Sequence, residues 1–333
     1  MSIIKASYKS LQSKLIMCGV LQFILAVGIG LIACLAVADD YVGKRVLHID
    51  SYHQGNIWND RIADAVRETL QNTGVELKII HLDTKRNPSE EFQKAAALKT
   101  KSLIEVFRPD VVIASDDNAS KYLIMPYYRN AKLPFVFCGL NWDASIYGFP
   151  YKNVTGMVEV SPIPQIVKLL KQYAKGESIG YLTEDTMTKR KELAYHKKLF
   201  EIEYDKVYLV KSFKEWKQAY LKAQNEVDML MILGIAALTD WDDGKAQALV
   251  ENHTKIPSGT DFSWLMHVAM LGVGKVPEEQ GRWAAHAALK ILDGVPPAKI
   301  PLTYNREGEL YFNKKIAASI GITDIPPLAK IVP

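Results

Sequence analysis

Cysteine is scarce in this sequence of 333 residues, which contains three. Cys18 and Cys34 lie in an apolar segment near the N-terminus, so the rest of the chain has one thiol, Cys138. A single thiol cannot form an internal disulfide, and a small disulfide-stapled fold is therefore excluded. The fold must be stable through its packing alone.

Motifs that bind nucleotide phosphates are absent as well. Neither G-x-x-x-x-G-K-[ST] nor G-x-G-x-x-G occurs, and the glycines of MLGVGKV, residues 270–276, lack the required setting. Asp50, Ser51 and His53 are near neighbours, but residues so close on an extended chain do not form a Ser–His–Asp triad. We therefore expect no catalytic residue, no enzyme and no cofactor.

Metal-binding patterns are also missing. The seven histidines are scattered and form neither H-E-x-x-H nor a His/Cys pair at zinc-finger spacing, so we expect no metal site. The carboxylates of Asp116, Asp117 and Asp143 provide an alternative, because three oxygen ligands could hold a hard cation.

An excess of basic charge is absent once the N-terminal segment is set apart. The chain has 41 Lys and Arg against 37 Asp and Glu, and residues 1–38 contain three lysines and no acid, which leaves 38 against 37. The remaining charges are interspersed and form no basic run. This balance argues against a nucleic-acid partner.

The N-terminal segment has the features of a secretory signal peptide. Three lysines precede a long uncharged apolar run that ends in the small-x-small pattern Ala36-Val37-Ala38. We predict cleavage after Ala38. Two alternatives are a lipobox that ends at Cys34, with a lipid anchor on this residue, and an uncleaved membrane anchor. All three place the folded part in the periplasm or another extracytoplasmic compartment.

Strand-like and helix-like segments alternate along the remaining residues, about 295 in number. A βαβ series runs from RVLHIDS at residue 45 to LPFVFCGLN at residue 133, and a second begins with SIGYLTED at residue 178. The change falls near residues 160–165, where two prolines interrupt the pattern. The alternation predicts an α/β fold with two Rossmann-like lobes, each with a parallel sheet.

Polar residues collect where the predicted strands end, which is where ligands bind in an open parallel sheet. Each residue taken alone could equally cap a helix or begin a turn, but their common position on both lobes predicts a ligand-binding site. The predicted ligand-binding residues are Ser51, Tyr52, His53, Asp116, Asp117, Asn118, Asn141, Trp142, Glu184, Asp185, Thr260 and Asp261.

Several segments together resemble the ABC_sub_bind family of ABC-transporter substrate-binding proteins. They are LHIDSYHQGNIWND, VVIASDDNASKYL, LPFVFCGLN with NVTGMVE, GRWAAHAALKILDGVPPAKIPL, and the terminal N-x-x-x-A-x-x-x-G pattern through Asn313, Ala317 and Gly321. The resemblance implies the type I periplasmic binding fold, with crossover strands joining the lobes and a hinge that closes on a small molecule. It implies lobe 1 at residues 44–158 with about 276–300 returning to it, and lobe 2 at 160–275 with 301–333 crossing the hinge.

The resemblance also implies which residues face the cleft from each lobe. Ser51, Tyr52, Asn118 and Asn141 match family positions that face the cleft from the first lobe, and Glu184, Asp185 and Asp261 would approach from the second. The surplus of acids favours a ligand with an amine or several hydroxyls, and Tyr52, Trp142 and Phe262 could stack on a ring. The first-lobe loops offer no obvious arginine for a bidentate carboxylate contact.

The resulting hypothesis is a monomeric, exported solute-binding protein that delivers a small polar or aromatic solute, amino-acid-like or related, to an ABC permease. The alternative is a sensory module of the same fold that signals to a membrane histidine kinase. An enzyme on an α/β scaffold is a third hypothesis, which the missing motifs disfavour.

The signal-peptide hypothesis predicts a mature protein that begins at Asp39. Intact-mass measurement of the exported protein should give the mass of residues 39–333 without modification. A mass that corresponds to a chain starting at a diacylglyceryl-modified Cys34 would establish the lipoprotein instead.

Overall fold

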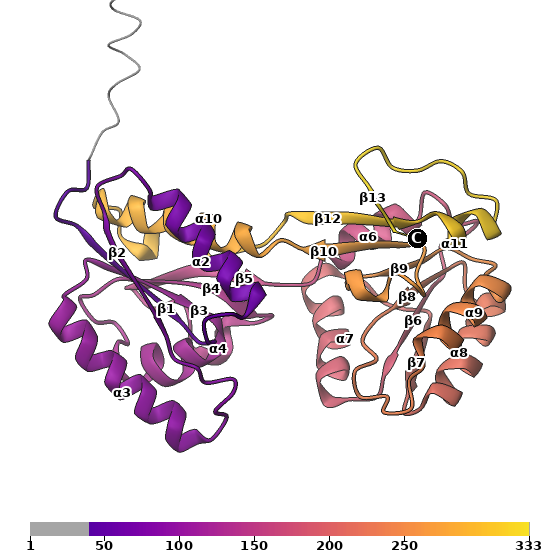
Figure 1. Ribbon diagram of the computed structural model, residues 1–333, viewed down its shortest axis with the longest axis horizontal. Helices are drawn as coiled ribbons and strands as arrows, with labels where there is room; N and C mark the ends of the chain where they lie inside the picture. The colour runs from indigo at the N-terminus through magenta and orange to yellow at the C-terminus, as the bar shows by residue number, and fades with distance from the viewer. Residues whose placement is uncertain (1–39, 333) are drawn as a thin grey trace, which may run out of the picture.

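The protein is described by a computed structural model that covers residues 40–332. The chain forms two α/β lobes that lie side by side (Figure 1). The predicted signal peptide, its cleavage site after Ala38 and Cys34 lie outside the described residues. Within residues 40–332, no helix is both long and apolar enough to cross a membrane.

Lobe 1 is built on a parallel sheet, for which the described residues supply six strands in the order β11-β5-β4-β3-β1-β2. These strands are β1 (Arg45–Asp50), β2 (Glu76–His81), β3 (Val111–Ser115), β4 (Phe135–Asn141), β5 (Val154–Glu159) and β11 (Thr303–Tyr304). The helical elements are α2 (Ile57–Leu70), α3 (Glu90–Phe107), α4 (Asp116–Ala119), the π-helical turn η1 (Ser120–Ile124), α5 (Met125–Tyr127), η2 (Ala144–Tyr147), α10 (Pro277–Leu292) and η4 (Pro297–Lys299).

Lobe 2 is built on a second sheet with the order β13-β12-β10-β9-β8-β6-β7 among the described residues. β12 runs antiparallel to β10, and the other pairs are parallel. The strands are β6 (Ile179–Glu184), β7 (Lys206–Val210), β8 (Met229–Ile232), β9 (Ser258–Thr260), β10 (Leu271–Lys275), β12 (Gly308–Asn313) and β13 (Lys330–Val332). The helical elements are α6 (Ile163–Leu170), α7 (Met187–Phe200), α8 (Phe213–Glu226), α9 (Asp243–His253), η3 (Ser263–Leu265) and α11 (Lys314–Ser319).

Side-chain caps fix where the longer helices begin. The side chains of Asn56, Ser89, Thr186 and Ser212 each accept a hydrogen bond from the backbone N–H three residues later. These bonds satisfy N–H groups that the first turn of a helix leaves without a partner. The helices that follow the strands therefore start at defined residues, and the strand-to-helix loops have fixed ends.

The chain crosses between the lobes three times within residues 40–332, at residues 160–162, at Val276 and at residues 305–307. The first and third crossovers are bonded to each other. The side-chain oxygen of Asn305 accepts from the backbone N–H of Val160 at 2.7 Å, and its amide group donates to the Val160 carbonyl at 3.1 Å. Asn305 is 7% exposed, so this pair of bonds is shielded from water.

Helix α10 returns to lobe 1 and lies against α2 (Figure 1). Small residues make this close approach possible: Ala284 and Ala288 on α10 pack with Ile62 and Val66 on α2. Gly281 lies closest, because a Cβ atom placed there would be 2.3 Å from the backbone oxygen of Ile62. The apolar face of α2 is thus covered by a helix that is distant in the sequence.

Gly281→Ala should destabilise the protein although alanine favours helix formation by about 1 kcal/mol relative to glycine. The added methyl group must push α10 away from the α2 backbone, and such overpacking typically costs about 1–3 kcal/mol. Gly244→Ala in α9 is the matched control, because a Cβ there meets only an Asp242 oxygen at 3.6 Å. Urea denaturation should show a lower midpoint for Gly281→Ala alone, and an unchanged midpoint would contradict the close packing.

Candidate functional site

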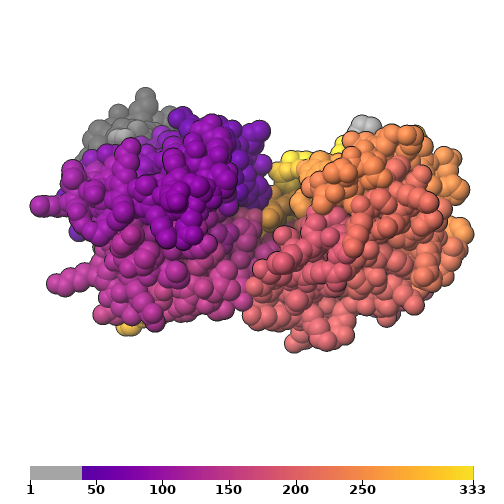
Figure 2. Space-filling view, turned by 90° about the horizontal axis from the view of Figure 1, so that it is seen from below, coloured from indigo at the N-terminus to yellow at the C-terminus, as the bar shows by residue number. Residues whose placement is uncertain are grey.

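A cavity of about 400 Å³ lies between the two lobes, where the strands of both sheets end. Figure 2 shows the hollow between the lobes on the face seen there. Both lobes line the cavity, with Tyr52, Trp58, Arg61, Asp116, Asn141, Glu159, Asp261, Phe262, Ser263, Trp264, Gly274, Lys275, Glu309 and Tyr311. Larger cavities exist elsewhere on the protein, but this cavity combines walls from both lobes with the carboxyl ends of parallel strands.

The lobe-1 wall contains a buried acid with a lysine partner. Asp116 directly follows β3, has a positive φ of 73° and is 6% exposed. The Lys85 ammonium lies 3.0 Å from one Asp116 carboxylate oxygen and 5.0 Å from the centre of the Tyr52 ring. Burial raises the pKa of Asp116 to about 6, although Lys85 acts in the opposite direction.

A second ion pair joins the lobes at the hinge. Glu159, at the end of β5, pairs with Lys275, at the end of β10. Burial acts to lower the pKa of Lys275, but Glu159, Asp261 and Glu192 together outweigh burial, and the net pKa is raised. The Lys275 ammonium also lies 5.2 Å from the Trp58 ring, where a cation–π contact stabilises its charge.

The lobe-2 wall contains a buried carboxylate that is only half satisfied. Asp261 follows β9 and is 7% exposed. Its Oδ2 accepts a hydrogen bond from Ser161 at 2.6 Å, while its buried Oδ1 has no hydrogen-bond partner among the described residues. An unpaired buried acceptor costs about 1–3 kcal/mol, so a donor from a bound molecule would relieve this cost.

Four of the twelve predicted residues line the cavity, namely Tyr52, Asp116, Asn141 and Asp261. Others form hydrogen bonds within their own lobe. The Ser51 hydroxyl is fully buried and donates to the Ser115 carbonyl at 2.7 Å. The Asn118 amide group donates to the Thr84 hydroxyl, Thr260 accepts from a backbone N–H, and Glu184 accepts from the Ala237 N–H.

Asp117 is held by two neighbours from lobe 1. One carboxylate oxygen accepts from the Asn141 amide at 2.7 Å, and the other accepts from the Tyr147 hydroxyl at 2.8 Å. His53 lies 3.9 Å from Asp83, and Asp185 pairs with Arg190 on the surface of lobe 2. None of the three residues lines the cavity, and their predicted contact with a ligand stays a prediction.

Trp142 and Asp143 bridge the two lobes outside the cavity. The Trp142 ring stacks on Tyr195 of α7 with centroids 5.7 Å apart and planes 4° apart. Asp143 accepts a hydrogen bond from Lys198 of α7 at 2.9 Å. Asp143 therefore has its own partner, and within residues 40–332 no cluster of three or more His, Cys, Asp or Glu could hold a metal ion.

Several lining residues did not appear in the sequence prediction. Glu159 and Lys275 end strands β5 and β10, so the strand-end rule applies to them and could have found them. Trp58 and Arg61 belong to the first turns of α2, where the sequence gives only the helix pattern. Arg61 forms a bidentate ion pair with Glu278, with one nitrogen–oxygen distance of 2.9 Å, so its guanidinium is already engaged.

The segment GESIG, residues 176–180, matches the G-x-S-x-G pattern of a nucleophile elbow. The elbow requires its serine to follow a strand and open a helix, whereas Ser178 precedes strand β6. Its hydroxyl donates to the Asp228 carboxylate at 2.5 Å. The pattern here marks the start of a strand, and it provides no histidine base.

The family model of ABC transporter substrate binding proteins, ABC_sub_bind, matches residues 58–328. The chain belongs to this family, as the sequence segments predicted. Comparison with curated proteins finds no match.

Solved structures agree in fold. The ligand-free, open structure of CD0873, a substrate binding protein with adhesive properties from Clostridium difficile, has a TM-score of 0.66 at 15% identity and covers 87% of this chain and 99% of its own. An ABC transporter solute binding protein from Bradyrhizobium sp. BTAi1 with bound Bis-Tris has a TM-score of 0.53 at 13% identity, over 86% and 89% of the two chains. The predicted α/β fold with two lobes of mostly parallel strands is confirmed.

The raised pKa of Asp116 predicts a pH dependence of stability. The folded carboxyl binds its proton more tightly than the unfolded one, so the free energy of unfolding should fall as pH rises from the unfolded pKa near 3.8 through about 6. Relative to Asp116→Asn, the unchanged protein should lose on the order of 2–3 kcal/mol across this window. Urea denaturation of both proteins between pH 4 and pH 7 measures the difference, and a difference that stays constant with pH would contradict the assigned burial.

Proposed function

We propose that the protein is an exported solute-binding protein that captures one small molecule between its lobes and delivers it to an ABC permease. The observation that carries this proposal is the interlobe cavity, which is lined from both sheets and contains the unpaired buried oxygen of Asp261. Membership of the substrate-binding family supports it. In this proposal the protein acts outside the cytoplasmic membrane, as a monomer, and without a cofactor or a reaction.

The side chains of the cavity favour an amino-acid-like solute with an amine or hydroxyl donor and an aromatic or apolar part. Asp261 offers an acceptor for the donor. Five aromatic side chains from both lobes provide surface for a ring: Tyr52, Trp58, Phe262, Trp264 and Tyr311. An anionic group on the same solute would lie near Lys85 or Lys275, each of which already has a carboxylate partner.

Ligand capture would proceed by a hinge motion. The crossovers are short, and the two walls of the cavity belong to different lobes, so a solute contacts both walls fully only when the lobes approach each other. A ligand that contacts both lobes binds the closed arrangement more tightly than the open one, and it therefore shifts the protein toward the closed arrangement.

Mass spectrometry of small molecules released from the purified protein, followed by a thermal-shift screen with amino acids, amines and sugars, tests the proposed function. Asp261→Asn should weaken binding of a confirmed ligand at least about tenfold, since a charge-assisted hydrogen bond contributes roughly 1.5–3 kcal/mol. The melting temperature of the empty protein should stay close to that of the unchanged protein, because asparagine can still accept from Ser161.

Asp324→Asn is the matched control, since Asp324 is an exposed acid of the same lobe and lies outside the cavity wall. It should leave affinity unchanged in a calorimetric titration. Equal weakening by both variants, or none by Asp261→Asn, would count against this position of the ligand. A protein that neither carries nor binds any compound of the panel would count against solute binding itself.

A further inference from the structure

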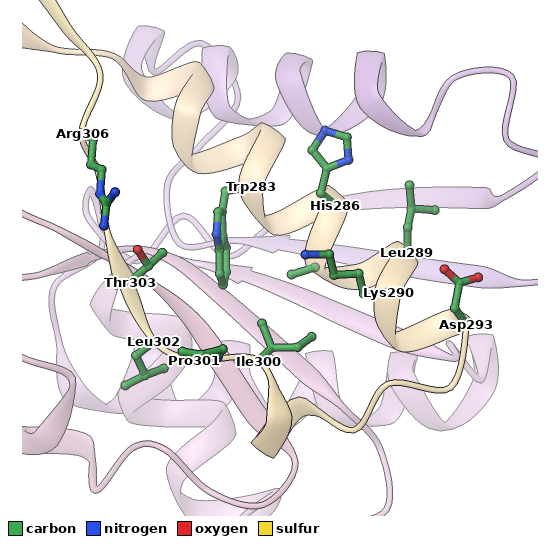
Figure 3. A pocket seen from close by; sticks show the side chains of 11 residues that line it. Trp283, His286, Leu289, Lys290, Asp293, Ile300, Pro301, Leu302, Thr303 and Arg306 are labelled. Carbon is green, nitrogen blue, oxygen red and sulfur yellow. The ribbon is translucent and has the colours of Figure 1, made fainter.

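A groove of about 740 Å³ lies on lobe 1, lined only by lobe-1 elements and the third crossover. One wall is the face of α10 that carries Trp283, Ala287 and Lys290, which recur at the four- and three-residue spacing of one helix face. The other wall is the segment 300–303 together with Arg306 of the third crossover. Figure 3 shows the Trp283 ring between Arg306 on one side and Lys290 on the other. We call this cavity the outer groove.

Both walls of the outer groove are fixed by contacts to the rest of lobe 1. Helix α10 packs closely on α2 through Gly281. The opposite wall is anchored because Thr155 donates a hydrogen bond to the Ile300 carbonyl at 2.7 Å, and because Thr303 and Tyr304 pair with β5. The groove therefore exists before any ligand arrives, as is usual for small-molecule sites, and its volume is within their ordinary range.

The charges of the outer groove differ from those of the interlobe cavity. In the cavity and beside it, Lys85, Lys275 and Arg61 each pair with a carboxylate. In the groove, Lys290 and Arg306 have no ion-pair partner within residues 40–332, whereas the neighbouring Arg282 pairs with Glu307. The one acid in the lining, Asp293, accepts a hydrogen bond from Tyr41 at 2.8 Å. Lys290 and Arg306 thus face the groove without an ion-pair partner among residues 40–332, and Asp293 is the one acid that lines the groove with them.

The surface between these cations is largely apolar. The Trp283 ring forms its centre, and aliphatic side chains continue it on both walls, from Ala287, Leu289, Ile300, Pro301 and Leu302. A flat ring can lie on the indole, while an anionic substituent reaches Lys290 or Arg306. We propose that the outer groove is a second ligand site, which binds a small aromatic molecule carrying a carboxylate or sulfonate group. This proposal does not rest on the proposed function of the interlobe cavity.

Arg306 connects the ligand site with the hinge, because it lines the outer groove and also belongs to the third crossover. Its backbone N–H donates to both oxygens of the Glu279 side chain, at 2.8 and 3.0 Å, which fixes the middle of the third crossover to α10. A ligand between Arg306 and α10 would add a further link at the same point. The outer groove is therefore next to a segment that must adjust when the lobes move.

The fluorescent anion 8-anilinonaphthalene-1-sulfonate is a suitable probe, because it carries a sulfonate on an aromatic body and brightens on apolar surfaces. Titration of the purified protein should show saturable binding at one site. Lys290→Gln and Arg306→Gln should each raise the Kd at least about fivefold. Arg306→Lys retains the charge, so its Kd should be much closer to that of the unchanged protein than the Kd of Arg306→Gln. Trp283→Leu should weaken binding as well, since it removes the ring that the probe covers.

Lys99→Gln is the matched control, because Lys99 lines a separate cavity of about 580 Å³ between β2 and α3. It should leave the Kd unchanged, and Asp261→Asn in the interlobe cavity should do the same. Lys290 and Arg306 are exposed, so melting curves of their variants should match the unchanged protein. No binding, equal weakening by Lys99→Gln, or affinity that depends on the interlobe residues and not on Lys290 and Arg306 would overturn the proposal.

Discussion

The arrangement of the two lobes depends on short chain crossings that meet at one buried asparagine. Asn305 bonds to both backbone groups of Val160 and so ties the first crossover to the third. The second crossover begins directly after Lys275. The ion pair between Lys275 and Glu159 of the first lobe holds this crossover next to the other two. In the proposed hinge motion, the lobes would rotate within these few residues while each sheet moves as one body.

The interlobe cavity has lysines that are paired with carboxylates and one aspartate with an oxygen that accepts no hydrogen bond from residues 40–332. Lys85 and Lys275 have carboxylate partners, so their charge is locally balanced. Asp261 has one satisfied and one unsatisfied oxygen, both shielded from water. A molecule with a positively charged or hydroxyl donor gains more from this wall than an anion does, because only the donor removes an existing desolvation cost. The same local balance separates the cavity from the outer groove, where the cations have no ion-pair partner within residues 40–332.

The fold could be predicted from the sequence because its strand and helix periodicities alternate regularly and helix caps mark the junctions. The strand-end rule also placed Tyr52 and Asp261 in the wall of the cavity. The rule could not tell which of two adjacent residues faces the cavity. Ser51 turns inward and bonds to Ser115, whereas Tyr52 turns toward the cavity. Such alternation is expected for successive side chains of an extended chain. Lys85 and Trp58 could not be found this way, because a loop and a helix bring them to the site only after folding.

The return of α10 to lobe 1 has a consequence for the order in which the protein can fold during synthesis. The apolar side chains of α2 and the first sheet stay uncovered until residues 277–292 have been made, because α10 completes their core. Lobe 2 likewise waits for β12, whose Phe312 lies within its core. Neither core is complete until these late segments of the chain have been made. An incompletely folded chain is the form that passes through a narrow translocation channel, so the late completion of both cores would suit the proposed export, with chaperones shielding the exposed apolar segments in the meantime.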